Sequence, residues 1–184
     1  GRFKGLIPVG QALAESRNAV AMWIAAQIGI DRVLRTSRTL GIRTPLQRVA
    51  TTALGASEIN LLELANAYRT MASGIVAEPY VIRAVLRDSG EILATPRRGP
   101  VPISVDRDAL SLIQEGLRGV VRLPTGTAHA LASRGFPIAI MGKTGTTSDF
   151  RDAIYAGSTY GPDGITAAVR IGFDDNRSLG SRET

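Results

Sequence analysis

The sequence predicts an α+β fold in which helices flank an antiparallel sheet. Apolar residues recur at helical spacing through most of the first half of the chain. A hairpin pattern and a long helical segment occupy the middle, and strand-like segments separated by turn residues fill the last third. With 184 residues, of which 44% are apolar, the chain can bury one sizeable core. We therefore expect one domain without repeats.

The first half of the chain predicts four helices. They span Val9–Ala14, Val20–Ile28, Asp31–Leu40 and Asn60–Ala72. Gly41 ends the third helix, Asn60 caps the fourth, and Gly74 lies just beyond the end of the fourth. The fourth helix carries an apolar stripe that we expect to be core. Its members are Leu61, Leu64, Ala65, Tyr68, Met71 and Ala72.

A hairpin is predicted where Asp88-Ser89-Gly90 joins two strand-like runs, over Tyr80–Arg87 and Glu91–Ala94. A proline-rich link over Thr95–Pro102 then leads to a long helix, which we expect Ser104 to cap and which ends near Val121. A turn at Pro124–Thr127 precedes a short helix, and Gly161–Gly164 is a later turn. The last third predicts three antiparallel strands. They span Ile138–Thr146, Ala153–Tyr160 and Ile165–Phe173.

Residues 142–147, Gly-Lys-Thr-Gly-Thr-Thr, carry the strongest functional signal. Lysine is rare in this chain, because Lys4 and Lys143 are the only lysines among 22 basic residues. The apolar run Ile138–Met141 precedes Lys143, so a buried strand is expected to lead into a polar and sterically open edge. Such an edge offers a cation, three hydroxyls and accessible backbone to an anion or a developing oxyanion. The pattern is typical of an acyl-transfer site.

A phosphate-binding loop is the alternative interpretation of Gly142-Lys143-Thr144. That loop needs a glycine four intervening residues before the Gly-Lys pair. The position holds Pro137, and Gly135 is out of register. The intervening residues also predict a strand instead of a glycine-rich loop, which argues against this class of site.

Ser16-Arg17-Asn18 is the second element, and it lies between two predicted helices. A connection of this kind can project one hydroxyl and one carboxamide into a cleft. The serine can relay a proton, and the asparagine can hold a substrate amide. Taken alone, Ser-x-Asn is more often a cap or a turn. Its occurrence before Lys143, in this order, favours a functional role.

With these motifs, the chain resembles the transpeptidase domain of class A penicillin-binding proteins over nearly its whole length. Those enzymes combine a Ser-x-x-Lys nucleophile motif with Ser-x-Asn and Lys-Thr-Gly. The resembling stretches are 12–20, 40–42, 53–58, 62–68, 142–153 and 171–176. The resemblance implies the serine β-lactamase and penicillin-binding transpeptidase fold, with a five-stranded sheet flanked by helices.

The nucleophile motif is missing, because no serine is followed by lysine three residues later. In the family this motif precedes Ser-x-Asn, so we expect it upstream of Gly1. The resemblance likewise places the first two strands of the sheet and its closing helix outside the chain. We therefore expect residues 1–184 to form a partial transpeptidase domain that is unstable and does not acylate by itself.

The resemblance implies a reaction at the D-Ala-D-Ala amide of a peptidoglycan stem peptide. The upstream serine would attack this amide, and the acyl group would pass to an amino group of a neighbouring strand. Ser16 is expected to relay a proton to the leaving amine and Asn18 to position the peptide. Lys143 is expected to hold Ser16 electrostatically and to attract the terminal carboxylate. These three residues form the predicted catalytic set.

Four residues after Lys143 form the predicted substrate-binding set: Thr144, Gly145, Thr146 and Thr147. The hydroxyls of Thr144 and Thr146 are expected to bind the carboxylate, and the Thr146 N–H to form half of an oxyanion hole. Gly145 keeps the edge free of a side chain, so that substrate can lie along the strand. The effect of Arg17 inside the Ser-x-Asn motif on substrate choice stays open.

Composition limits the other function classes. The net charge is +6, but the arginines are scattered and only 5% of residues are aromatic, so we expect no nucleic-acid partner. The chain has no cysteine, His129 is its only histidine, and Asp174-Asp175-Asn176 lacks the spacing of a calcium loop. We therefore expect neither a metal nor a cofactor, and no histidine-based triad.

The resemblance implies further partners and a location. β-Lactams are expected inhibitors, a membrane anchor is expected upstream, and a glycosyltransferase domain is suggested before it. The protein is then expected in the bacterial cell envelope, on the outer side of the cytoplasmic membrane. Two rival functions stay open: a serine β-lactamase, and a non-catalytic domain that binds or senses β-lactam or cell-wall peptide.

Overall fold

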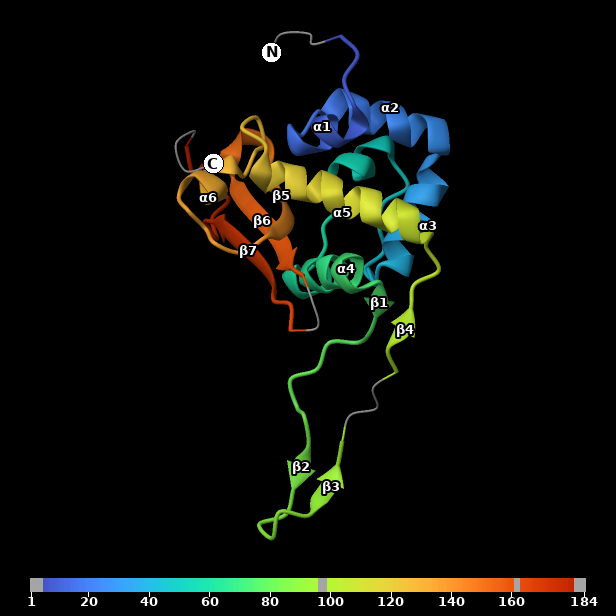
Figure 1. Ribbon diagram of the computed structural model, residues 1–184, viewed down its shortest axis with the longest axis vertical. Coiled ribbons are helices and arrows are strands. Elements are labelled where there is room, and N and C mark those ends of the chain that lie inside the picture. The colour runs from blue at the N-terminus through green and yellow to red at the C-terminus, as the bar shows by residue number, and fades with distance from the viewer. Residues whose placement is uncertain (1–4, 96–98, 161–162, 181–184) are drawn as a thin grey trace.

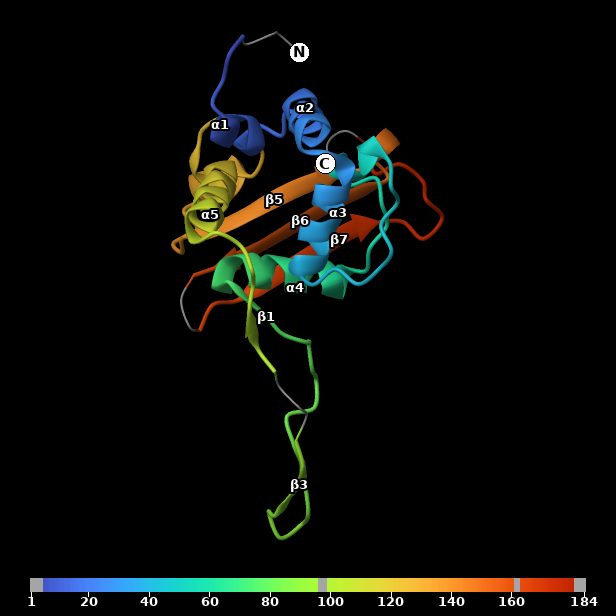
Figure 2. The ribbon, with the colours of Figure 1, turned by 90° about the vertical axis from the view of Figure 1, so that its right-hand side faces the viewer.

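The computed structural model describes residues 5–95, 99–160 and 163–180 (Figure 1). A three-stranded sheet and the helices beside it form the body, and a long arm projects away from them (Figures 1 and 2). This arrangement confirms the predicted α+β class. None of the helices in these ranges is long and apolar enough to cross a membrane.

The helices of the first half lie close to their predicted positions. They are α1 (Val9–Ala14), α2 (Asn18–Ile28), α3 (Ile30–Thr39) and α4 (Leu61–Ser73), with a 3-10 segment, η1 (Ala50–Leu54), before α4. Helix α2 begins two residues earlier than predicted, so Asn18 is its first residue. The predicted caps of α4 are confirmed, because the Asn60 side chain accepts a hydrogen bond from the Glu63 N–H and Gly74 takes a left-handed conformation.

The second half adds α5 (Arg107–Arg122) and α6 (His129–Ser133). The expected Ser104 cap is wrong. Asp106 caps α5 instead, and its Oδ1 accepts a hydrogen bond from the Ala109 N–H at 2.9 Å. A carboxylate in this position also interacts favourably with the positive end of the helix dipole, and Ser104 stands too far before the first helical turn to reach it.

The predicted core stripe of α4 is only partly correct. Leu61 is exposed, and the other predicted members are half-buried. The residues that α4 buries fully are Ala67 and Thr70. Helix α4 packs against the sheet strands β6 and β7, and short side chains allow this close approach.

The sheet consists of β5 (Ile140–Thr146), β6 (Asp152–Thr159) and β7 (Thr166–Gly172), in the order β5-β6-β7. Both pairs of strands are antiparallel, as predicted. Pairing starts at Ile140, so Ile138 stays outside the ladder and is exposed, contrary to the prediction of a buried strand from Ile138. A 3-10 segment, η2 (Ser148–Phe150), joins β5 to β6. The predicted turn at Gly161–Gly164 begins with two residues outside the described ranges.

The arm contains the predicted hairpin. Strands β2 (Val85–Leu86) and β3 (Ile92–Ala94) pair near its far end, and both are shorter than predicted. At its base, β1 (Ile75–Val76) pairs with β4 (Val101–Pro102), which lies within the predicted proline-rich link. Residues 96–98 of that link are outside the described part of the chain.

Helix α5 supports elements on two sides. Val120 and Val121 of α5 form a buried cluster with Ala128, and Ile140 and Tyr155 of the sheet pack against it. On another side, α1 lies against α5 at Gly116 and Gly119. A Cβ added at Gly119 would lie 3.4 Å from the Ala14 Cβ. Glycine at these positions therefore lets the end of α1 approach the axis of α5 closely.

Candidate functional site

The Ser-x-Asn motif forms the turn between α1 and α2. The Ser16 N–H donates to Leu13 O at 3.1 Å and the Arg17 N–H to Ala12 O at 2.9 Å. This is the hydrogen-bond pattern of a Schellman helix end, whose left-handed position glycine usually takes. Ser16 occupies that position with φ 55°. Ser16 and Asn18 are both exposed, so the turn presents the hydroxyl and the carboxamide to solvent.

The Lys-Thr-Gly motif lies in β5, where Lys143 pairs with Ala156 of β6. Lys143 is half-buried, and desolvation lowers the pKa of its ammonium below the ordinary lysine value. The Nζ donates a hydrogen bond to Thr144 O at 2.9 Å. Within the described residues it forms no ion pair with a carboxylate. The cation is therefore available to an anionic ligand.

The glycines on either side of Lys143-Thr144 differ in what surrounds them. A Cβ added at Gly142 would overlap the Tyr155 hydroxyl and lie 2.8 Å from Ala156 O, so the fold itself requires glycine there. A Cβ added at Gly145 would meet only Ile154 Cβ at 3.8 Å, an ordinary contact. Gly145 is also exposed. The surrounding chain therefore gives no packing reason for glycine at position 145.

Thr127 contacts both the end of α1, directly before the Ser-x-Asn motif, and the Lys-Thr-Gly motif. Its hydroxyl accepts a hydrogen bond from the Thr144 hydroxyl at 2.6 Å, and its backbone N–H donates to Ala14 O at 3.1 Å. Ala14 lies two residues before Ser16, and Thr144 directly follows Lys143. The turn that carries Thr127 therefore contacts both the end of α1 and strand β5.

The fold of this turn depends on Gly126. A Cβ at Gly126 would overlap Val120 O and lie 2.7 Å from Gly119 O, so the turn lies directly on the last part of α5. The Ala128 N–H donates to Val120 O at 3.0 Å and fixes the turn further. The sequence predicted a turn here but no functional role, because neither Gly126 nor Thr127 belongs to a motif that signals one.

The remaining predicted residues have different surroundings. Thr146 is exposed at the end of β5. The Thr147 hydroxyl accepts a hydrogen bond from the Asp152 N–H at 2.7 Å, and its own N–H donates to Asp152 O at 3.1 Å. Thr147 therefore closes the connection between β5 and β6. Within the described ranges no hydrogen bond joins Ser16 or Asn18 directly to residues 143–147, whereas Thr127 bonds to Ala14 and to Thr144.

Other candidate centres are weak. His129 is half-buried at the start of α6, and its Nδ1 lies 3.3 Å from Val121 O. Asp174 and Asp175 lie in a turn after β7, as predicted. Across the described part of the chain, no group of three His, Cys, Asp or Glu side chains is placed to hold a metal.

Comparison with known families agrees with the fold. The model of the penicillin binding protein transpeptidase domain matches residues 2–160. The chain belongs to this family. Penicillin-binding protein 1A of Neisseria gonorrhoeae is 34% identical over 186 residues, which cover 98% of this chain and 23% of that protein. Penicillin-binding protein 1A of Pseudomonas aeruginosa is 30% identical over 232 residues, covering 98% of this chain and 28% of that protein.

Solved structures show the same fold. A crystal structure of penicillin-binding protein 1A from Haemophilus influenzae superposes with a TM-score of 0.83 at 26% identity, covering 98% of this chain and 32% of that chain. Penicillin-binding protein A of M. tuberculosis, solved as an imipenem acyl-enzyme complex, gives a TM-score of 0.74 at 19% identity, covering 95% and 44% of the two chains. The chain thus has the penicillin-binding transpeptidase fold and spans about a quarter of the length of the curated relatives.

Proposed function

We propose that this chain carries the substrate-binding part of a peptidoglycan D,D-transpeptidase, a serine acyltransferase that cross-links the cell wall. Membership in the transpeptidase family supports the reaction class. The observation that carries the proposal is the contact of Thr127 with both Ala14 and Thr144, because it holds Ser-x-Asn and Lys-Thr-Gly in one assembly. The sequence has no Ser-x-x-Lys, so the proposed nucleophile lies outside these 184 residues.

In the proposed reaction the external serine Oγ attacks the carbonyl carbon between the two D-alanines. The C–N bond of that amide then breaks, and Ser16 relays the proton that the attacking serine gives up to the leaving amine. Asn18 holds the peptide in place. An amino group of a neighbouring strand next attacks the acyl ester, releases the serine and forms the cross-link. Attack by water on the ester that the same serine forms with a β-lactam would instead make the protein a β-lactamase.

Lys143 and its neighbours are proposed to bind the substrate. The half-buried ammonium attracts the terminal carboxylate, because it has no ion-pair partner among the described residues and is partly removed from solvent. Thr144 and Thr146 donate their hydroxyl hydrogens to the same carboxylate, and the Thr144 hydroxyl, which donates to Thr127 in the structure, then accepts from the Thr127 hydroxyl instead. The Thr146 N–H stabilises the oxyanion. The absence of a packing reason for Gly145 supports the idea that its missing side chain leaves room for a peptide. Thr147 is proposed as a further contact, after its hydroxyl exchanges Asp152 for substrate.

The proposal includes partners and a location. The curated relatives are penicillin-binding proteins 1A, which favours a cell-envelope protein that acts outside the cytoplasmic membrane. Its partners would be peptidoglycan stem peptides and β-lactams. An upstream membrane anchor and a glycosyltransferase domain are part of the same proposal, and neither nucleic acid nor a cofactor is needed.

Labelling with fluorescent penicillin tests the proposal in the complete polypeptide that contains this sequence. We expect a stable covalent adduct that Ser16→Ala or Lys143→Ala greatly reduces. Ser89→Ala, in the exposed hairpin turn of the arm, is the matched control and should label normally. Rapid release of the label would indicate a β-lactamase. Absence of any adduct would refute both enzymatic functions and favour a binding or sensor domain.

A further inference from the structure

The left-handed conformation of Ser16 calls for local support. A side chain at φ 55° is crowded by its own backbone, and glycine is favoured there because it lacks a Cβ. The hydroxyl that the proposed reaction needs cannot be supplied by glycine. The turn must therefore be held by neighbouring groups.

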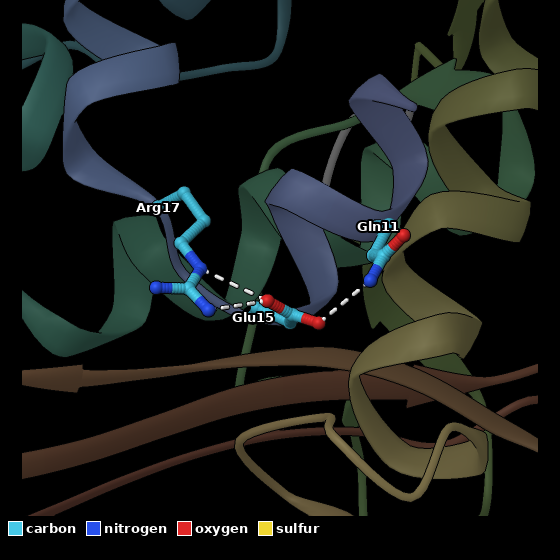
Figure 3. A network of polar contacts seen from close by, with 3 residues as sticks. All are labelled: Gln11, Glu15 and Arg17. Atoms are coloured by element: carbon cyan, nitrogen blue, oxygen red, sulfur yellow. Dashed lines mark hydrogen bonds and ion pairs between the residues drawn. The ribbon is translucent and has the colours of Figure 1, made fainter. Parts of the chain in front are cut away.

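Glu15 and Arg17, on either side of Ser16, form such a support (Figure 3). Arg17 Nε and Nη2 both donate to Glu15 Oε2, at 2.9 and 2.7 Å. Glu15 Oε1 accepts a hydrogen bond from Gln11 Nε2 at 2.9 Å. The Glu15 side chain is only 3% exposed, whereas the Arg17 side chain is 35% exposed. A largely desolvated carboxylate is thus bonded to α1 through Gln11 and to the start of α2 through Arg17.

We propose that the Glu15–Arg17 pair is a positioning device that holds Ser16 in its left-handed conformation and aims its hydroxyl at the reacting atoms. The pair bridges residues i−1 and i+1, so both peptide groups of Ser16 are restrained. Burial of Glu15 strengthens the interaction, because solvent does not compete for the carboxylate. This inference rests on the proposed function for its catalytic consequence, but the restraint itself does not depend on it.

The same contacts decide what Arg17 does. Its Nε and Nη2 are bonded to Glu15, and its positive charge is offset by a carboxylate within hydrogen-bond distance. A guanidinium held in this way does not add a free cation for the substrate carboxylate. We therefore assign Arg17 to the turn and leave carboxylate binding to Lys143.

Acylation kinetics of the complete polypeptide test the catalytic consequence. Arg17→Met, which keeps the aliphatic stem, and Glu15→Gln should each slow acylation by penicillin about tenfold while the dissociation constant of the initial complex stays constant. Arg17→Lys should recover part of the rate, because lysine keeps the charge without the planar fork. Arg87→Met is the matched control, since Arg87 forms an exposed pair with Glu91 in the arm, and should leave the rate unchanged.

The outcomes separate the competing explanations. A raised dissociation constant for Arg17→Met, with Glu15→Gln unaffected, would mean that Arg17 contacts the ligand and would overturn the inference. Normal acylation by Arg17→Met and Glu15→Gln would also overturn it. If the wild-type polypeptide forms no adduct, the proposed function fails, and the restraint is then judged from stability alone.

Stability is measured as a double-mutant cycle between Arg17→Met and Ser16→Gly. Arg17→Met should lower the melting temperature when Ser16 is present and lower it clearly less in the Ser16→Gly background, because glycine adopts the left-handed conformation without strain. Equal shifts in the two backgrounds would show that the pair does not support Ser16, and would overturn the inference whatever the activity.

Discussion

Thr127→Val is the substitution that most directly tests the link between the two motifs. Valine keeps the branched shape of threonine but cannot accept the hydrogen bond that the Thr144 hydroxyl donates at 2.6 Å. The backbone bond from the Thr127 N–H to Ala14 O remains available in the variant. The substitution therefore removes one of the two contacts and leaves the other.

The size of the effect follows from the hydrogen bond and its surroundings. A neutral hydrogen bond contributes about 0.5–1.5 kcal/mol net. Thr127 is exposed, so water can partly replace the lost partner and the lower part of this range applies. If that energy holds Thr144 in the geometry that binds the carboxylate, the acylation rate should fall about two- to fivefold.

The assay is the second-order rate of acylation by fluorescent penicillin, measured on the complete polypeptide. Thr127→Ser is the matched control, because serine restores the hydroxyl and should keep most of the wild-type rate. Melting curves should show little change for either variant, since the turn keeps its backbone bonds. An unchanged rate for Thr127→Val, or an equal loss for Thr127→Ser, would refute the idea that this hydroxyl aligns Lys-Thr-Gly.

Three further predictions concern the packing around the site and the charge of Lys143. Gly126→Ala should destabilise the protein by about 2 kcal/mol or more, because the added Cβ overlaps Val120 O on α5. Gly10→Ala is the control and should not destabilise the protein, because its Cβ would meet nothing within 4 Å. Equal melting temperatures for the two variants would contradict this prediction. Tyr155→Phe should change the free energy of unfolding by less than about 1 kcal/mol, because the buried hydroxyl has no hydrogen-bond partner in the described residues. A larger loss of stability in a denaturant titration would show that the hydroxyl does have a partner. Burial lowers the pKa of Lys143 below the ordinary lysine value, so its charge is lost as pH rises through that lowered value. Acylation should therefore fall at alkaline pH, at a lower pH than an ordinary lysine would produce. Lys143→Arg, although slower overall, should lack this fall because arginine stays charged. Identical pH–rate profiles would count against a charged Lys143.

Features set by local chemistry could be predicted from the sequence. Asn60 caps α4 because its side chain reaches an N–H three residues later, and this depends only on nearby residues. Lys143 was found because an apolar run, a rare lysine and small neighbours stand together in the sequence. The prediction of a polar strand edge at Lys143 did not depend on contacts between distant residues.

Features set by contacts between distant residues could not be predicted. Thr127 is of interest because it bonds to Ala14 and Thr144. Both residues are far from Thr127 in the sequence and come near it only after α1, α5 and β5 have packed. The burial of Glu15 likewise depends on how the end of α1 lies in the folded chain. Ser104 and Asp106 are both good capping residues. Asp106 is the cap because α5 begins at Arg107, and packing of the folded chain sets that position.

Helix α5 explains how segments separated by more than half of the chain are held in one assembly. Gly116 and Gly119 of α5 allow α1 to approach closely, and Val120 and Val121 pack against β5 and β6. The turn that follows α5 carries Thr127. Each motif is thus positioned relative to the same rigid element and not directly relative to the other. Because close-packed helices move little without losing contacts, the spacing between Ser16 and Lys143 is set by α5. A ligand that bridges the two motifs would then meet an arrangement formed before it binds, which lowers the cost of ordering the site.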